Sequence, residues 1–139
     1  MGHVTPKNAI DKASRAFLAF NAMIFIGLGV RGLLEPAAHM AGFGLTDPGL
    51  MLLGEIRANY GGMHIGMGLM FMIGAWLPRW RAAAMLALLL FCAGLVFGRL
   101  VSWSADGRPS DFVMQLLIIE ILASLIAAGL LAALNRQPT

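Results

Sequence analysis

The sequence predicts an all-α integral membrane protein, a four-helix bundle with both termini on the cytoplasmic side. The first reason is composition: 59% of the 139 residues are hydrophobic, 12% are charged, and the mean hydropathy is +0.79. A soluble domain carries about a quarter charged residues, so this apolar excess indicates that lipid is the natural solvent. The second reason is that four apolar segments each reach the length of a membrane helix, about 20 residues. We expect residues 1–139 to form one membrane domain.

The first span is expected at residues 16–34, after a polar start that includes a possible short amphipathic lead-in at 11–15. A basic start followed by an apolar run also describes a signal peptide. This run is long, however, it contains Arg31, and no small-x-small cleavage site follows it. We therefore expect an uncleaved span. The polar connection at residues 35–47 contains Pro36, which can open one short interfacial turn.

The second span is expected at residues 48–77, with Asp47 as the N-cap and Pro48 at the first helical position. A helix of 30 residues is about 45 Å long, which exceeds the bilayer core of about 30 Å. We therefore expect this helix to tilt or to protrude from the membrane.

The third span is expected at 82–103, after a short basic turn at 79–81, and the fourth at 110–134. A tight polar connection at 104–108, with the turn pair Asp106-Gly107, separates them, and Pro109 or Ser110 opens the last helix. One predicted face collects most of the basic residues, namely Lys7, Lys12, Arg15, Arg79, Arg81 and Arg136, whereas the other has Arg108 in a loop and Arg31, Arg57 and Arg99 at or inside span ends. The first face is therefore predicted to be cytoplasmic.

The ionisable residues inside the spans converge on the outer half of the predicted bundle. A charge at the centre of a lipid bilayer costs about 2.5–3.5 kcal/mol on insertion scales, so these residues must pair or line a wet cavity. Glu120 lies roughly 15 Å beyond Ser110, close to the midplane. We expect Glu120 to pair with Arg99 or Arg57, with further donors nearby. The candidate polar cluster for a ligand comprises Glu55, Arg57, Asn59, Tyr60, His64, Arg99, Ser102, Asp106 and Glu120.

The second span carries polar residues on more than one face, which predicts a central helix with several neighbours. Glu55, Asn59, Gly62 and Gly66 share one face at helical spacing, and Arg57, His64 and Gly68 share roughly the opposite one. The spacings Gly62-x-x-x-Gly66 and Gly94-x-x-x-Gly98 predict close helix packing, because small residues let two backbones approach each other.

The run Glu55-Ile56-Arg57-Ala58-x-Tyr60-Gly61-Gly62, followed by Gly66-x-Gly68, resembles the signature of a known family. The family is the "domain of unknown function 4345" family of small bacterial four-helix membrane proteins. Gly98-Arg99-x-x-Ser102, Asp106-Gly107-x-Pro109 and Glu120 are similar to its second half. The resemblance extends from about Phe17 to Leu134. It implies four membrane helices in a bacterial inner membrane, and it implies no activity, cofactor or partner.

Three hypotheses for function follow from the polar cluster. The first is a binding or accessory protein that holds a lipid, a quinone or a small acid, or that docks a partner membrane protein or a second copy. The second is a small membrane enzyme with Glu120 or Glu55 as base and an arginine as anion anchor. The third is a proton-coupled transporter that acts as an oligomer. A purely structural ion-pair network is the alternative to all three.

Other classes of function lack support in the sequence. The net charge is only +3 without a long basic run, which argues against nucleic-acid binding. His3, His39 and His64 show no spacing typical of a metal site, so we expect no metal ligands. Cys92 lies in an apolar run, where an inert buried thiol is expected. No nucleophile motif or phosphate loop names a catalytic residue or a cofactor.

Overall fold

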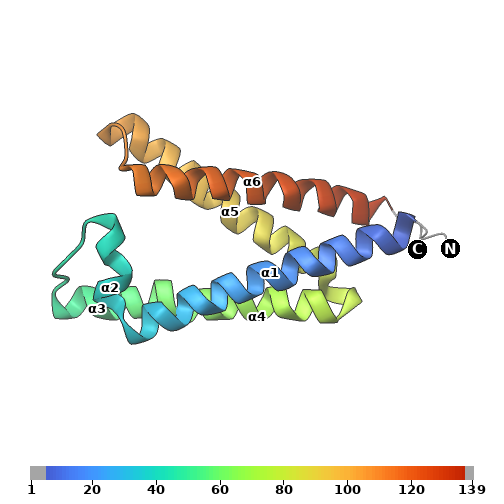
Figure 1. Ribbon diagram of the computed structural model, residues 1–139, viewed down its shortest axis with the longest axis horizontal. Coiled ribbons are helices and arrows are strands. Elements are labelled where there is room, and N and C mark those ends of the chain that lie inside the picture. The colour runs from blue at the N-terminus through green and yellow to red at the C-terminus, as the bar shows by residue number, and fades with distance from the viewer. Residues whose placement is uncertain (1–5, 137–139) are drawn as a thin grey trace. The chain divides into compact units, whose positions relative to one another are not determined.

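The computed structural model describes residues 6–136, and all of the elements in that range are helical (Figure 1). Three helices are long and apolar enough to cross a membrane: α1 from Ala9 onward, α5 and α6. The prediction of an all-helical protein with membrane-length helices is therefore confirmed. The elements in order are α1 (Pro6–Leu34), α2 (Pro36–Met40), the 3-10 turn η1 (Ala41–Phe43), α3 (Leu50–Ile56), the π-helical segment η2 (Arg57–Gly62), α4 (Met63–Trp76), α5 (Pro78–Asp106) and α6 (Asp111–Asn135).

The predicted second span is helical from Leu50 to Trp76, but it consists of α3, η2 and α4 in succession. Its predicted start at Asp47 and Pro48 is wrong. Gly49 is the N-cap, with extended backbone at φ −61° and ψ 163°, and the N–H of Leu53 donates to the Gly49 carbonyl at 3.0 Å. The helix begins later because Asp47 makes no capping bond and Gly49 adopts the backbone that an N-cap requires.

The π-helical segment η2 widens the middle of this long helix. The N–H of Met63 donates to the carbonyl of Ala58, five residues earlier instead of four. Single π turns inside α-helices are rare and are frequent at functional sites. The segment coincides with the run from Arg57 to Gly62 that carries the family resemblance, and a uniform helical period did not predict it.

The chain divides into two compact units, one made of Phe20–Met70 and one made of two segments, Met1–Ala19 with Phe71–Thr139. We call them the Phe20–Met70 unit and the two-segment unit. Helix α1 contributes its first half to the two-segment unit and its second half to the other.

In the Phe20–Met70 unit, glycines at the contact let α1 pack closely against the backbone and side chains of η2 and α4. A Cβ atom at Gly32 would lie 2.5 Å from the Tyr60 carbonyl oxygen, and one at Gly29 would lie 2.9 Å from the Gly61 oxygen. Gly61 and Gly68 face α1 in the same way, against Leu33 and against Ala22 and Ile26 respectively. Such close approach is the usual basis of helix association in lipid, where apolar burial gives little driving force.

In the two-segment unit, α5 and α6 form an antiparallel hairpin (Figure 1). Ser110 is the N-cap of α6, and its Oγ accepts from the N–H of Val113, in agreement with one of the two predicted starts. The predicted connection at 104–108 is too early, because α5 continues to Asp106. Gly107 ends the helix at φ 95°, a left-handed conformation that glycine adopts without steric cost.

Helix α5 begins at Pro78, directly after the extended residue Leu77, so Arg79 and Arg81 are helical rather than part of a turn. Arg81 is almost fully buried, at 7% exposure. Its Nη1 pairs with Asp11 of α1 at 3.2 Å, and its other nitrogens donate to carbonyls in the last turn of α4, Gly74 and Ala75, each at 3.3 Å. The residue thus joins three helices of the two-segment unit by satisfying carbonyls that a helix C-terminus leaves open.

Candidate functional site

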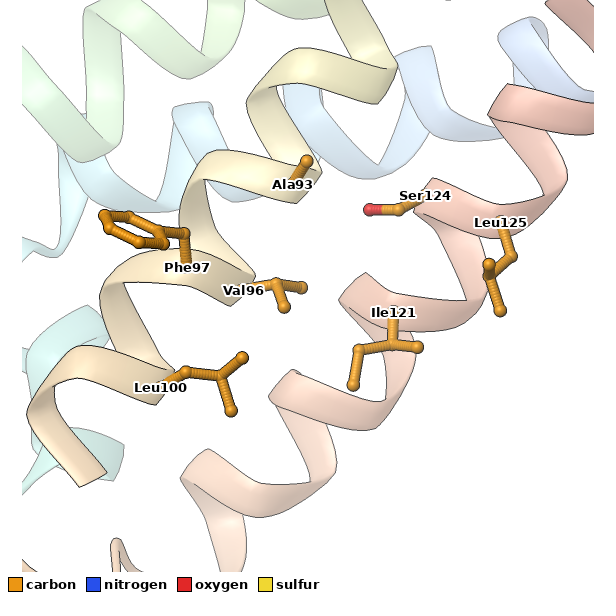
Figure 2. Close-up of a pocket in the computed structure, with 7 residues that line it drawn as sticks. All are labelled: Ala93, Val96, Phe97, Leu100, Ile121, Ser124 and Leu125. Carbon is orange, nitrogen blue, oxygen red and sulfur yellow. The ribbon is translucent and has the colours of Figure 1, made fainter. Parts of the chain in front are cut away.

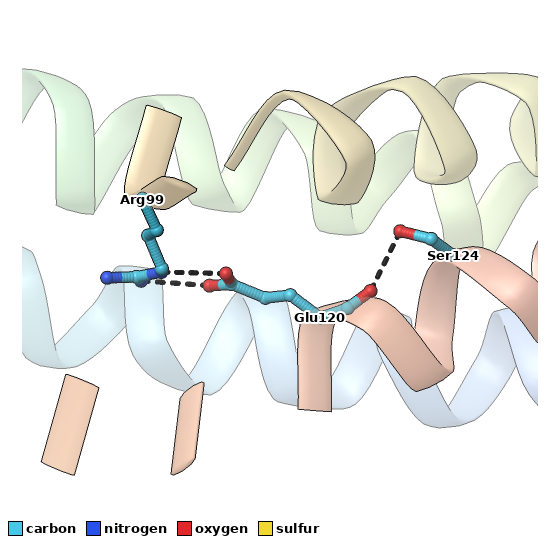
Figure 3. A network of polar contacts seen from close by, with 3 residues as sticks. All are labelled: Arg99, Glu120 and Ser124. Carbon is cyan, nitrogen blue, oxygen red and sulfur yellow. Dashed lines mark hydrogen bonds and ion pairs between the residues drawn. The ribbon is translucent and has the colours of Figure 1, made fainter. Parts of the chain in front are cut away.

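The strongest polar contact in the described part of the molecule joins Arg99 of α5 to Glu120 of α6. The Nε of Arg99 donates to Oε2 of Glu120 at 2.7 Å, and Nη2 donates to Oε1 at 2.9 Å, which makes a two-pronged ion pair (Figure 3). The side chains are 19% and 12% exposed. Of the two partners that the sequence left open for Glu120, Arg99 is the one in contact. The Ser124 hydroxyl donates to the backbone carbonyl of Glu120 at 2.7 Å.

This geometry explains how two charges are accommodated inside apolar helices. Parallel N–H···O bonds to a carboxylate are among the stronger hydrogen bonds in proteins. They use two of the five N–H groups of the guanidinium. In Figure 3 the third nitrogen, Nη1, points away from the carboxylate. Nη1 has no partner among the described residues of the two-segment unit, so Arg99 retains donors for another acceptor.

Ser102 and Asp106 lie on the same side of α5 as Arg99, three and seven residues further on. The Ser102 hydroxyl donates to Oδ2 of Asp106 at 2.9 Å, and both residues are exposed. A polar strip therefore runs about 10 Å along α5, from the end of the helix to the Arg99–Glu120 pair. These four predicted site residues belong to one unit and form one continuous polar side.

A groove between α5 and α6 lies next to the Arg99–Glu120 pair, since Ser124, whose hydroxyl donates to the Glu120 carbonyl, is also one of its lining residues. It has a volume of about 250 Å³, and Figure 2 shows Val96 and Leu100 facing Ile121 and Ser124 across it. Helical phase turns Phe97 and Leu100 well away from the direction of Arg99. The groove is apolar apart from the Ser124 hydroxyl, so the ion pair and the groove offer chemically different surfaces.

The other predicted site residues lie in the Phe20–Met70 unit, and they do not form an ion-pair network there. The Nε of Arg57 donates to the carbonyl of Leu33 at 3.2 Å, in the last turn of α1. Glu55 instead takes a bond from the amide of Asn59, whose Nδ2 lies 3.3 Å from Oε2 and 3.0 Å from the Glu55 carbonyl. Glu55 and Arg57 therefore face different partners, as their predicted opposite faces require.

His64 and Tyr60 belong to a cluster of five rings in the Phe20–Met70 unit. The Nδ1 of His64 lies 2.9 Å from the Asn59 carbonyl, which can only accept, so Nδ1 carries the proton in this contact. The imidazole stacks on Phe25 at 5.4 Å between centroids and on Tyr60 at 5.8 Å. His39 and Phe43 tilt against Tyr60 at 5.6 and 6.4 Å. The rings connect α1, η2, α4, α2 and η1.

His39 is the group in this cluster whose titration is shifted. Burial lowers the pKa of His39 below its usual value of 6.5, with smaller electrostatic contributions from Arg31 and His64. Burial and a neighbouring like charge both disfavour the protonated imidazole.

The glycines predicted for helix packing are in open positions within their own units. A Cβ at Gly66, Gly94 or Gly98 would meet no atom within 4 Å, and one at Gly62 would meet only the Arg57 oxygen at 4.0 Å. Their role in packing stays a prediction. No group of three or more potential metal ligands occurs in the described range 6–136.

Several contacts in the structure were not predicted. Arg81 was placed on the basic face, in a turn, although its spacing of 18 residues from Arg99, five full turns, puts both residues on one side of a continuous α5. The spacing Gly29-x-x-Gly32 in α1 was also a usable signal for the close approach to η2. The ring contacts of His39 and Phe43 depend on how α2 and η1 fold, which no pattern in the sequence indicated.

Comparison with known proteins identifies a family but no activity. The model of a family described as a domain of unknown function (DUF4345) matches residues 13–131. This range contains the signature run of η2 as well as Arg99 and Glu120, so it confirms the family that the sequence resembles. No curated protein and no solved structure matches the chain.

Proposed function

The chain belongs to the DUF4345 family, and from the geometry of its polar residues we propose that it is a membrane protein that binds a lipid or a quinone at the Arg99–Glu120 pair. The proposal takes the helical segment from Leu50 to Trp76 as a further span and places both termini on the cytoplasmic side of a bacterial inner membrane. The distribution of Lys and Arg supports this orientation.

The observation that carries the proposal is the set of unused donors on Arg99. The guanidinium is held in place by Glu120, and Nη1 points away from the carboxylate (Figure 3). An ionisable pair inside a membrane helix is expensive to maintain and is usually functional. A preorganised guanidinium with free donors suits a ligand with acceptor oxygens.

A lipid and a quinone both satisfy this requirement, because both are membrane-soluble and carry carbonyl or ester oxygens. Trp103 lies four residues beyond Arg99, on nearly the same side of α5, and the residue is 38% exposed. An exposed indole on that side offers a planar quinone ring a stacking partner, which gives the quinone specific support.

The enzyme hypothesis receives less support from the same contacts. A general base must have an oxygen available for the proton that it removes. Both carboxylate oxygens of Glu120 accept hydrogen bonds from Arg99, and Glu55 is bonded to Asn59. The pair is better suited to hold a ligand than to move a proton.

The test is to identify what co-purifies with the protein. The full chain is extracted in a mild detergent, and its organic extract is analysed by mass spectrometry and near-ultraviolet absorbance. We expect about one lipid or quinone per chain, and the absorbance of a quinone ring distinguishes the two. The same analysis is made on Arg99→Lys, which keeps a positive partner for Glu120 but removes the outward-facing guanidinium nitrogen.

The matched control is Arg108→Lys, because Arg108 pairs with Asp111 in an exposed part of the same hairpin, at 3.1 Å. We expect the ligand to be lost in Arg99→Lys and retained in Arg108→Lys, with unchanged thermal stability in both. Equal ligand content in the three proteins would contradict the proposal and would leave the pair with a structural role.

A further inference from the structure

The apolar groove between α5 and α6 begins at the level of the Arg99–Glu120 pair. On α5, the lining residue Val96 lies three residues before Arg99, and on α6, Ser124 lies four residues after Glu120. Residues at these spacings are neighbours on the surface of a helix. The Ser124 hydroxyl also donates to the Glu120 carbonyl at 2.7 Å, which joins a lining residue to the pair directly. The groove and the pair are therefore adjacent.

The groove extends from the pair in one direction along the hairpin. On α5 it reaches Ala93, six residues before Arg99, or about 9 Å along the helix axis. On α6 it reaches Leu125, five residues after Glu120. Because the two helices are antiparallel, these steps lead to the same end of the hairpin (Figure 1). Both helices are long and apolar enough to cross a membrane, so the groove runs along hydrocarbon-facing helices.

The size and the lining of the groove suit a hydrocarbon chain. Its volume of about 250 Å³ is smaller than the roughly 300–1,000 Å³ of pockets that enclose a whole drug-sized ligand. Six of its lining residues are apolar, and the hydroxyl of the seventh, Ser124, is already donated to the Glu120 carbonyl. Figure 2 shows the lining side chains along both helices, with the groove lengthwise between them. This shape accepts one chain but no polar head group.

We propose that the groove binds the hydrocarbon chain of the ligand held at Arg99, and that this ligand is a quinone with a single chain. The chain site rests on the proposed function, because its ligand is the one that Arg99 binds. Trp103 and Ala93 lie on opposite sides of Arg99 along α5, four residues after it and six before it. A ring at Trp103, a carbonyl oxygen at Arg99 and a chain toward Ala93 follow that order. A lipid with two chains would have to place the second one outside this groove.

The experiment measures the affinity of the full chain in a mild detergent for decylubiquinone and for its analogue without the decyl chain. Ala93→Phe fills the groove. We expect this variant to bind decylubiquinone about tenfold more weakly and the chainless analogue as before, because only the chain reaches Ala93. The control is Ala128→Phe, which adds the same ring at an exposed position of α6 outside the groove and should change neither affinity.

Phe97→Ala is a second variant, chosen because it adds no bulk and its position is 70% exposed. It removes one wall of the groove and should also weaken the binding of decylubiquinone alone. Retained binding of the chainless analogue shows that a variant is folded. Equal affinity for decylubiquinone in Ala93→Phe, Phe97→Ala and Ala128→Phe would overturn the placement of the chain.

Arg99→Lys distinguishes a failure of the chain site from a failure of the proposed function. Loss of both quinones in Arg99→Lys, with no effect of Ala93→Phe, would leave the ligand at Arg99 and overturn the chain site alone. Unchanged binding of both quinones in Arg99→Lys would overturn the two together. Dioctanoyl phosphatidylglycerol is the third probe, and if it binds in an Arg99-dependent way while neither quinone does, the assignment to a quinone is wrong.

Discussion

The two units are held together by different means. In the Phe20–Met70 unit, Gly29 and Gly32 of α1 bring the helix into contact with the backbone of η2. In the two-segment unit, Gly94 and Gly98 of α5 have open space around them within the unit, and a charged pair links α5 to α6. Helices in lipid associate by close van der Waals packing or by polar contacts. The contact of α1 with η2 and the contact of α5 with α6 each rely mainly on one of these, so each should fail in response to a different kind of substitution.

The largest effect is expected when one partner of the charged pair is removed. Arg99→Met leaves the Glu120 carboxylate unpaired among apolar helices, which should cost about 3–5 kcal/mol of stability. Thermal unfolding in detergent measures the loss. The double variant Arg99→Met with Glu120→Leu should recover much of it, because no charge remains buried. A double variant as unstable as the single one would show that the pair does more than compensate its own charges.

The second effect tests the glycine contact. Gly32→Ala places a methyl group 2.5 Å from the Tyr60 carbonyl, where backbone must move, and should cost about 1–3 kcal/mol. Gly27→Ala is the control on the same helix, because a Cβ there meets nothing within 4 Å. Equal unfolding temperatures for the two variants would mean that α1 and η2 are not packed as closely as described.

The third effect compares two arginines that satisfy helix carbonyls, one in each unit. Arg81→Met leaves the carbonyls of Gly74 and Ala75 without these donors and the half-exposed carboxylate of Asp11 without its partner, and should cost about 1–3 kcal/mol. Arg57→Met removes one bond at an exposed position and should cost less than about 1 kcal/mol. Denaturation of both variants under one condition gives the order, and a reversed order would contradict the burial of Arg81.

The smallest effect is a pH dependence confined to the ring cluster. The pKa of His39 is lower in the folded protein than its usual value of 6.5, so the unfolded chain binds more protons in that range. Stability is therefore fully present above about pH 6.5 and declines as the pH falls through that value. We expect the unfolding temperature to drop by about 1–3 °C between pH 7.5 and 5.5. His39→Gln should flatten the profile, and an unchanged slope in that variant would assign the dependence to another group.

The sequence was sufficient to predict those features that one large free-energy contribution decides. Apolar length predicted helices that are long enough to cross a membrane, and the cost of burying Glu120 requires a cation within reach, so Arg99 was one of two predicted partners. Arg57, His64 and Gly68 share a face, as helical spacing predicted, and all three contact α1. These predictions rest on helical periodicity and on charge, and both can be read directly from the amino-acid sequence.

The features that the sequence did not predict depend on competition between alternative backbone conformations and on neighbouring helices. Whether Asp47 or Gly49 caps α3 is decided by small differences in backbone preference, and whether Arg81 faces solvent or helix carbonyls is decided by the neighbouring helices. The placement of His39 over Tyr60 requires the path of a whole connection. The π turn is a further case, because nothing in a list of residue types states that one turn will hold an additional residue.

Because the π turn holds one additional residue, the number of residues between Arg57 and Gly62 is itself required for the contacts of this helix. Removing Ala58 would allow an uninterrupted α-helix, and it would rotate everything before the deletion by about 100° relative to α4. The guanidinium of Arg57 would then leave the Leu33 carbonyl, even though every contact residue was still present. Related chains should therefore tolerate many substitutions between Arg57 and Gly62 more readily than the loss of one position, since a deletion changes the direction in which each neighbouring side chain points.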